Sequence, residues 1–240
     1  MSINLEKRTQ QVGIILAKRG LPVAPKTRVG VALDVSGSAK HFYENGVIQE
    51  TLDRLLAVAM KFDDDGNLDA WTFDNSVGEI PTITESDEGT YVKNKLLKSR
   101  VSLWGGTSYA PPLQKAMDFY FGEQAKPASG GFLGKLFGSK PAAPAAATSQ
   151  EPAMLLFITD GANGDEDRAA AVLREAAKSK TPVYFNMIGV GPANYFGFIQ
   201  RMADELPNVG FVSMTSLSIS DEQLFEAVVS EEFCEWAKKL

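Results

Sequence analysis

Short, uninterrupted apolar runs alternate along this chain with longer segments in which apolar residues recur at helical spacing. The runs at 28–33 and 153–159 are typical of central strands that are covered on both faces. Shorter apolar segments predict further strands at 68–73, 77–80, 183–190 and 209–212. Helical spacing predicts helices at 5–18, 47–62, 90–98, 109–121, 167–178, 196–205 and 221–238. Ser220 is the expected N-cap of the last helix.

Strands that alternate with helices indicate parallel β-α-β units. The sequence therefore predicts an α/β fold: a three-layer, doubly wound, mostly parallel central sheet of about six strands, with helices on both faces. The segment 77–80 is expected to be one short antiparallel edge strand. The 240 residues, of which 44% are hydrophobic, suffice for one such domain. We expect this domain to span 27–240, with a helix and linker at 1–26 packed on it.

Proline, alanine, glycine and serine dominate the segment 127–152. This composition predicts a flexible insert, because it lacks the apolar content that would offset chain entropy. Within it, 131–138 is a short apolar and basic island. A locally packed or disordered loop is the simpler interpretation, and contact with a partner or a membrane surface is the alternative.

The net charge and the cysteine and histidine content argue against several classes of function. The net charge of −6 and the lack of a basic stripe argue against nucleic-acid binding. Cys234 is the only cysteine and His41 the only histidine, so the sequence offers neither an internal disulfide nor the usual zinc ligands. No window of about 20 apolar residues predicts a transmembrane segment, and no secretory signal pattern is present. We expect a cytoplasmic protein.

Oxygen-bearing side chains follow the two central strands and one glycine pair. Asp34, Ser36 and Ser38 follow the first apolar run, Asp160 follows the second, and Thr107 comes after two glycines. The carboxyl ends of parallel strands share an edge, so these side chains converge if the two strands are neighbours. Hard oxygen donors suit Mg²⁺, with Mn²⁺ or Ca²⁺ as alternatives. Only two of these side chains, Asp34 and Asp160, are negatively charged, and the set is too small to enclose a cation. Water or a carboxylate from outside would complete the ion's coordination shell.

Each of these motifs also has a purely structural interpretation. Ser36 or Ser38 could cap the helix at 47–62, Thr107 could cap the following helix, and Asp160 could begin a turn. Their occurrence together, in chain order and at the ends of the appropriate elements, favours a metal site.

The order Asp34-x-Ser36-x-Ser38, then Thr107, then Asp160 resembles the metal-ion-dependent adhesion site (MIDAS) of von Willebrand factor A (VWA) domains. The resemblance implies that Ser36, Ser38 and in some cases Thr107 contact the metal directly. It also implies that Asp34 and Asp160 act largely through water, and that an Asp or Glu of a protein partner supplies the last ligand.

The likeness to VWA domains spans about 27–240. The stretches 8–14, 62–66 and 105–111 are similar more narrowly to the VWA proteins of the bacterial tellurium and toxic-cation resistance (Ter) group. This narrower resemblance implies a role in stress resistance, with other tellurium-resistance proteins as partners.

Three functions are compatible with these residues. The favoured one is a non-enzymatic, metal-dependent interaction module. A Mg²⁺-dependent phosphoryl-transfer enzyme or hydrolase with Asp34 as nucleophile is the alternative, although Val35 and Ser36 stand where a second acid is expected. A scaffold with a vestigial metal site is the third.

Overall fold

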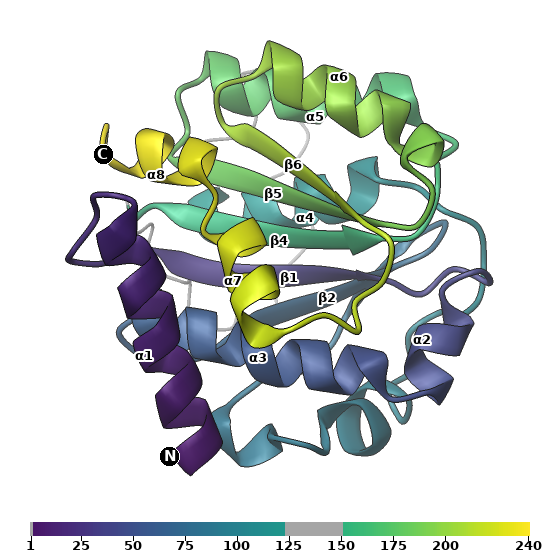
Figure 1. Ribbon diagram of the computed structural model, residues 1–240. Helices are drawn as coiled ribbons and strands as arrows, with labels where there is room; N and C mark the ends of the chain where they lie inside the picture. The colour runs from purple at the N-terminus through teal and green to yellow at the C-terminus, as the bar shows by residue number, and fades with distance from the viewer. Residues whose placement is uncertain (1, 123–150) are drawn as a thin grey trace, which may run out of the picture.

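A six-stranded sheet runs through the centre of the computed structural model, which describes residues 2–122 and 151–240 (Figure 1). Its strands are β1 (Arg28–Asp34), β2 (Asp69–Phe73), β3 (Val77–Glu79), β4 (Ala153–Thr159), β5 (Val183–Val190) and β6 (Val209–Met214). The strand order is β3-β2-β1-β4-β5-β6, and β3 pairs with β2 in the antiparallel direction while the other pairs are parallel. The predicted α/β fold is confirmed, including its antiparallel edge strand.

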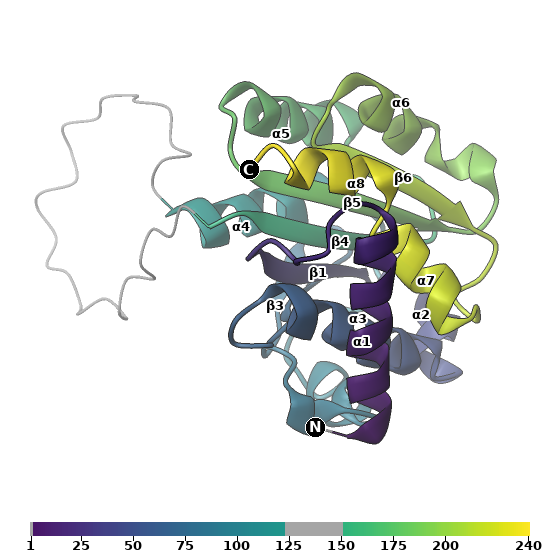
Figure 2. The ribbon, with the colours of Figure 1, turned by 60° about the vertical axis from the view of Figure 1, so that its left-hand side comes forward.

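Helices cover both faces of the sheet. They are α1 (Ile3–Lys18), α2 (Lys40–Glu44), α3 (Val47–Phe62), α4 (Ala110–Phe121), α5 (Glu166–Lys178), α6 (Gly197–Glu205), α7 (Asp221–Val228) and α8 (Glu231–Ala237). Short helical turns lie at Glu85–Asp87, Val92–Leu96 and Ala193–Phe196. The helices α1, α3, α7 and α8 pack on one face, and α4, α5 and α6 pack on the other (Figures 1 and 2). The central strands are thus buried on both sides, as their apolar runs predicted.

The closing segment differs from its prediction. The prediction of a single helix at 221–238 is wrong, because α7 ends at Val228 and α8 begins after Ser230. The carbonyl of Val228 accepts a hydrogen bond from the buried Asn186 side chain of β5 at 2.7 Å, and the Ser230 hydroxyl caps α8 by accepting from the Phe233 amide at 3.1 Å. Ser220 does cap α7, as predicted.

Two other helical segments also differ from expectation. The predicted helix at 90–98 is only a π-helical turn at Val92–Leu96, and α2 was not predicted at all. The predicted flexible insert at 127–152 lies outside the described residues except for its last two positions, and the 131–138 island lies wholly outside them. None of the helices within 2–122 and 151–240 is long and apolar enough to cross a bilayer.

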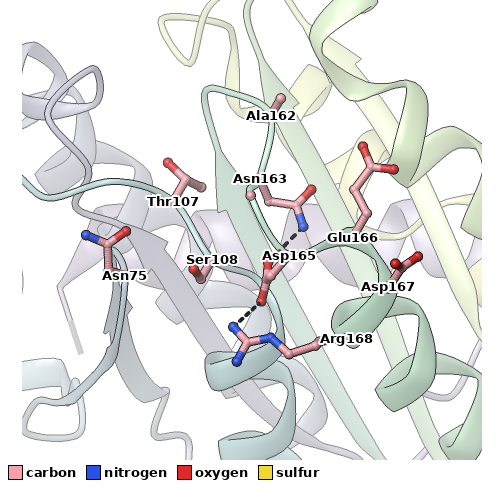
Figure 3. Close-up of a pocket in the computed structure, with 10 residues that line it drawn as sticks. Asn75, Thr107, Ser108, Ala162, Asn163, Asp165, Glu166, Asp167 and Arg168 are labelled. Atoms are coloured by element: carbon pink, nitrogen blue, oxygen red, sulfur yellow. Dashed lines mark hydrogen bonds and ion pairs between the residues drawn. The ribbon is translucent and has the colours of Figure 1, made fainter.

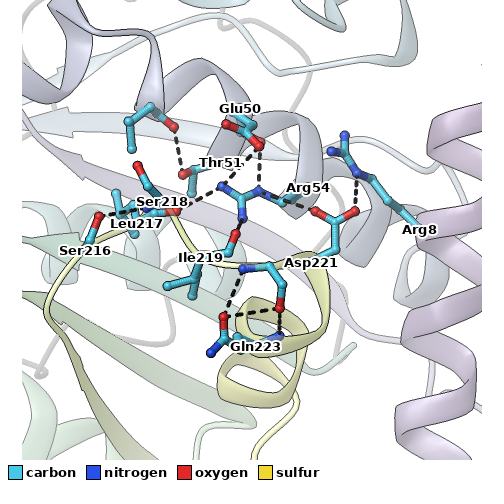
Figure 4. Close-up of polar contacts among 12 residues, drawn as sticks. Arg8, Glu50, Thr51, Arg54, Ser216, Leu217, Ser218, Ile219, Asp221 and Gln223 are labelled. Atoms are coloured by element: carbon cyan, nitrogen blue, oxygen red, sulfur yellow. Dashed lines mark hydrogen bonds and ion pairs between the residues drawn. The ribbon is translucent and has the colours of Figure 1, made fainter.

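A buried arginine joins three helices on the α1 face. The side chain of Arg54 on α3 is fully buried and donates hydrogen bonds to the carbonyls of Leu217 and Ile219, at 3.1 and 2.8 Å, in the segment that leads from β6 into α7 (Figure 4). Its Nε lies 3.9 Å from the carboxylate of Asp221, which also accepts a hydrogen bond of 2.9 Å from Arg8 of α1. A buried guanidinium is tolerated only when its donors are paired. Arg54 therefore fixes the start of α7 against α3, and Asp221 extends the contact to α1, which crosses α3 (Figure 2).

Replacing Arg54 with alanine should destabilise the fold strongly. The change leaves the Leu217 and Ile219 carbonyls without their donor and opens a cavity, at a cost of about 3–5 kcal/mol. We expect the melting temperature to fall by about 10 °C, measured by circular dichroism. Arg100→Ala, which removes an exposed arginine, should leave the melting temperature nearly unchanged. Equal melting temperatures for the Arg54 and Arg100 variants would contradict this account of the cluster.

Candidate metal centre

The candidate site lies at the carboxyl edge of β1 and β4, where the strand order changes direction. These two strands are parallel neighbours, with Leu33 opposite Ile158. Asp34 is the last residue of β1, and Asp160 directly follows β4. The side chains that follow these two strands therefore lie at the same edge of the sheet. Ligands of doubly wound sheets bind at such a point, where the strand order reverses.

A continuous chain of hydrogen bonds links four of the predicted residues. The Ser36 amide donates to Asp34 Oδ1 at 2.8 Å, the Ser36 and Ser38 hydroxyls lie 3.1 Å apart, and the Ser38 hydroxyl donates to Asp160 Oδ1 at 2.9 Å. Asp34 and Ser36 are buried, Asp160 is half-buried and Ser38 is exposed. The cluster is thus seated on the core and open to solvent on one side.

The fifth predicted residue, Thr107, lies on the loop that runs beside the Ser36 loop. This loop pairs with it, since the Gly37 amide donates to the Gly105 carbonyl at 2.9 Å and Ser36 forms a parallel bridge with Gly105. The Thr107 carbonyl accepts a hydrogen bond from the Gly164 amide at 3.0 Å. Within the described residues, the Thr107 hydroxyl is not part of the hydrogen-bonded chain.

The glycine pair before Thr107 is explained by close packing. A Cβ on Gly105 would lie 2.6 Å from Asp74 Oδ2, and one on Gly106 would lie 2.5 Å from Asn75 Oδ1. Asp74 is itself buried and accepts hydrogen bonds from Ser76 and Ser102. A side chain at either position would therefore clash with the turn after β2 and displace the loop.

Thr107 also faces a polar cleft beside the cluster. The cleft lies between the turn after β2, the Thr107 loop and the start of α5; Figure 3 shows Thr107, Asn163, Asp165 and Arg168 around it. Asp165 accepts hydrogen bonds from the amides of Tyr109 and Ala110 at 2.8 and 3.0 Å. Its carboxylate therefore caps α4 although the residue directly precedes α5, and it holds the two loops together.

Sequence reasoning missed three residues that position the cluster. The Thr159 hydroxyl donates to Asp34 Oδ2 at 2.7 Å, and the Tyr43 hydroxyl donates to the Asp34 carbonyl at 2.7 Å. Asp165 is the third. Of these three residues, only Thr159 could have been found from the local sequence. It carries a hydroxyl at the end of a predicted buried strand and directly precedes Asp160.

Burial shapes the electrostatics of both carboxylates in the cluster. Burial raises the pKa of Asp34, although hydrogen bonds from Ser36 and Thr159 act against the shift. Burial likewise raises the pKa of Asp160, against the hydrogen bond from Ser38. A cation beside these groups would favour their charged forms. At Asp165, by contrast, burial also acts to raise the pKa, but hydrogen bonds from Asn163 and from the α4 amides outweigh it. The pKa of Asp165 is therefore lowered.

The donor set fits a hard divalent cation. The described part of the chain has no group of three or more histidine, cysteine, aspartate or glutamate side chains that could hold a metal, so a site here relies on serine hydroxyls. The Ser36 and Ser38 hydroxyls lie 3.1 Å apart, and the Ser38 hydroxyl lies 2.9 Å from Asp160 Oδ1, so hard oxygen donors are gathered at one point of the sheet edge.

Comparison with solved structures supports the fold. Proximal thread matrix protein 1 from the mussel byssus superposes with a TM-score of 0.55 at 14% identity over 87% of this chain. The match covers 48% of the mussel protein, so the chain spans about half its length. Manganese-loaded TRAP protein of Plasmodium vivax gives a TM-score of 0.53 at 15% identity, over 86% of this chain and 73% of TRAP. At these identities the likeness shows the fold alone.

Comparison at the level of sequence is more specific. The uncharacterized protein YcbR of Bacillus subtilis (strain 168) is 30% identical over 243 residues, which covers 99% of this chain and 87% of YcbR. The model of the vWA-TerF-like family, described as the vWA found in the TerF C terminus, matches residues 26–129 and 142–240. The expected relationship to Ter-type VWA proteins is confirmed: the chain belongs to the vWA-TerF-like family of VWA domains.

Proposed function

We propose that this protein is a metal-ion-dependent interaction module that binds an acidic residue of a protein partner through Mg²⁺. The proposed metal site consists of Asp34, Ser36, Ser38, Thr107 and Asp160. The observation that carries the proposal is the half-open, hydrogen-bonded cluster of Asp34, Ser36, Ser38 and Asp160, which gathers hydroxyl and carboxylate oxygens at one point of the sheet edge.

In this proposal each residue has its own role. Ser36 and Ser38 would bind the ion directly, with Thr107 as a further hydroxyl ligand from the adjacent loop. Asp34 is buried and already accepts from the Ser36 amide and the Thr159 hydroxyl, which suits a carboxylate that orients the serines and acts on the metal through water. Asp160 would act in the same way from the exposed side. The bound cation would supply positive charge for the partner's carboxylate.

The small number of protein ligands leaves room for an outside carboxylate on the ion. Asp34 and Asp160 together offset a divalent charge, and the remaining protein donors are neutral hydroxyls. Mg²⁺ needs more oxygen ligands than this set provides, so water or an outside oxygen must complete its shell. The TRAP protein of Plasmodium vivax, which has a similar fold, crystallised in a manganese-loaded form. This is consistent with a divalent ion in such a fold. Mn²⁺ and Ca²⁺ therefore stay as alternatives to Mg²⁺.

The arrangement disfavours the enzymatic alternative. A nucleophilic aspartate needs a free oxygen directed at its substrate. Asp34 is 4% exposed, and both of its carboxylate oxygens accept hydrogen bonds, from Ser36 and from Thr159. We therefore infer binding rather than phosphoryl transfer or hydrolysis.

The family relationship provides the physiological setting of the proposal. Membership in the vWA-TerF-like family supports a role in tellurite or toxic-metal stress resistance, with other tellurium-resistance proteins as candidate partners. A cytoplasmic location is part of the proposal, supported by the single buried Cys234, which is compatible with a reducing compartment.

Metal binding should depend on the serine and aspartate cluster. We expect the purified protein to bind Mn²⁺, measured as the loss of the free-ion signal in electron paramagnetic resonance, and excess Mg²⁺ to compete. The double variant Asp34→Ala/Ser36→Ala should weaken Mn²⁺ binding by at least about 10-fold, because it removes one ligand and the group that orients it. Asp118→Ala, which removes an exposed carboxylate of α4, is the control and should bind as the wild type does. Undiminished Mn²⁺ binding by the double variant would refute the site.

Partner capture should require the metal. Immobilised protein is incubated with lysate of the organism that encodes it, once with Mg²⁺ and once with EDTA, and bound proteins are identified by mass spectrometry. We expect a set of proteins that is retained in Mg²⁺, released by EDTA and absent with Asp34→Ala/Ser36→Ala. Capture that survives both the chelator and the double variant would show that the metal plays no part in recognition and would favour a scaffold with a vestigial site.

A further inference from the structure

A basic and aromatic rim borders the proposed metal site on the Ser38 side. It consists of Lys40 and His41 at the start of α2 and of Trp104 on the adjacent loop. His41 Nδ1 donates to the Ser38 carbonyl at 2.8 Å, which holds the imidazole beside the ligand loop. The ammonium of Lys40 lies 6.0 Å from the centre of the Trp104 ring.

Trp104 is held in an unfavourable backbone conformation. Its φ of 68° lies in the left-handed region, which residues with a Cβ rarely adopt. The surrounding contacts enforce it: the Trp104 amide donates to the Val35 carbonyl at 2.6 Å, and the indole packs edge-on against Tyr43 at 5.4 Å. Backbone strain of this kind concentrates at functional sites.

The same contacts fix the indole relative to the metal site. Val35 separates Asp34 from Ser36, and the hydroxyl of Tyr43 donates to the Asp34 carbonyl. Trp104 nevertheless stays half-buried, so part of its surface faces solvent. A rigidly placed, partly exposed indole is the kind of residue that dominates binding energy in protein interfaces.

Lys40 is available to an incoming negative charge. Its partner Glu44 lies 3.4 Å away on the next turn of α2, and the two side chains are 52% and 64% exposed. Exposed pairs of this type contribute little stability and exchange readily. A carboxylate arriving near Ser38 would therefore find a cation on its flank.

We propose that Trp104 and Lys40 select the residues that flank the partner's metal-binding acid. The preferred partner segment carries a second carboxylate next to that acid, facing Lys40, and an aromatic or long aliphatic side chain that covers the Trp104 indole. This inference rests on the proposed function, because the acid must first bind the metal, and it adds the chemistry of the partner segment.

A peptide array tests the inference directly. The probes are immobilised nine-residue peptides of glycine and serine with one central glutamate, in which each flanking position is changed singly to every residue type. Labelled protein is applied in Mg²⁺ and in EDTA, and the difference is the specific signal. We expect that acidic and aromatic flanking residues increase the wild-type signal by about 5-fold or more.

Variants separate the rim from the metal site. Trp104→Ala should lose the aromatic preference and Lys40→Glu the acidic preference, while both bind Mn²⁺ as the wild type does. Phe119→Ala and Lys93→Glu are matched controls, since Phe119 is exposed beside Arg28 at the opposite edge of the sheet and Lys93 is an exposed lysine remote in sequence. Both controls should keep the wild-type preferences.

The outcomes of the array distinguish a failure of this inference from a failure of the proposed function. A Mg²⁺-dependent signal with no flanking preference, or with preferences unchanged in both rim variants, would overturn this inference and leave the proposed function standing. Absence of any Mg²⁺-dependent signal, in a protein that binds Mn²⁺, would overturn both. If Trp104→Ala fails to fold, the exposed substitution Lys40→Glu still decides whether the rim reads the flanking charge.

Discussion

The parallel pairing of β1 with β4 places the carboxylates of the proposed site at one edge of the sheet. It sets Leu33 opposite Ile158, so that Asp34 and Asp160 leave the sheet at the same edge. The strand order reverses between these two strands, and the loops that follow them can therefore diverge and leave an open crevice. Thr159 adds a direct link, because its hydroxyl at the end of β4 holds the carboxylate at the end of β1. The positions of Asp34, Ser36, Ser38 and Asp160 follow from this pairing, whereas Thr107 lies on a loop that pairs with the Ser36 loop.

The loops around the crevice are held by protein contacts. Asp165 ties the start of α4 to the loop before α5, and Asp74 and Asn75 fill the space that Gly105 and Gly106 leave open. Such contacts hold the loops that carry the serine hydroxyls, and preorganised loops lose less conformational entropy when a ligand binds. Burial of two carboxylates in the same place is unfavourable in the absence of a cation, and it is the feature of the site that a metal would relieve.

The sequence predicted those features that depend on local pattern. The apolar runs of β1 and β4 indicated buried parallel strands, and the polar residues that directly follow them indicated the site at their ends. Features that depend on contacts distant in sequence were not predictable. The break between α7 and α8 depends on Asn186 of β5, and the capping of α4 depends on Asp165. Arg54 occupies a position in a helix whose other buried residues are mostly apolar, and the carbonyls of Leu217 and Ile219 that accept its hydrogen bonds lie far away in the sequence.

A crystal of the protein soaked in Mn²⁺, with an anomalous difference map recorded near the manganese edge, would show directly where the ion binds. We expect one strong peak at the carboxyl edge of β1 and β4, within bonding distance of the Ser36 and Ser38 hydroxyls and close to Asp160. A well-resolved map in which these side chains point apart, with only solvent between them and the manganese peak elsewhere, would contradict the proposed site.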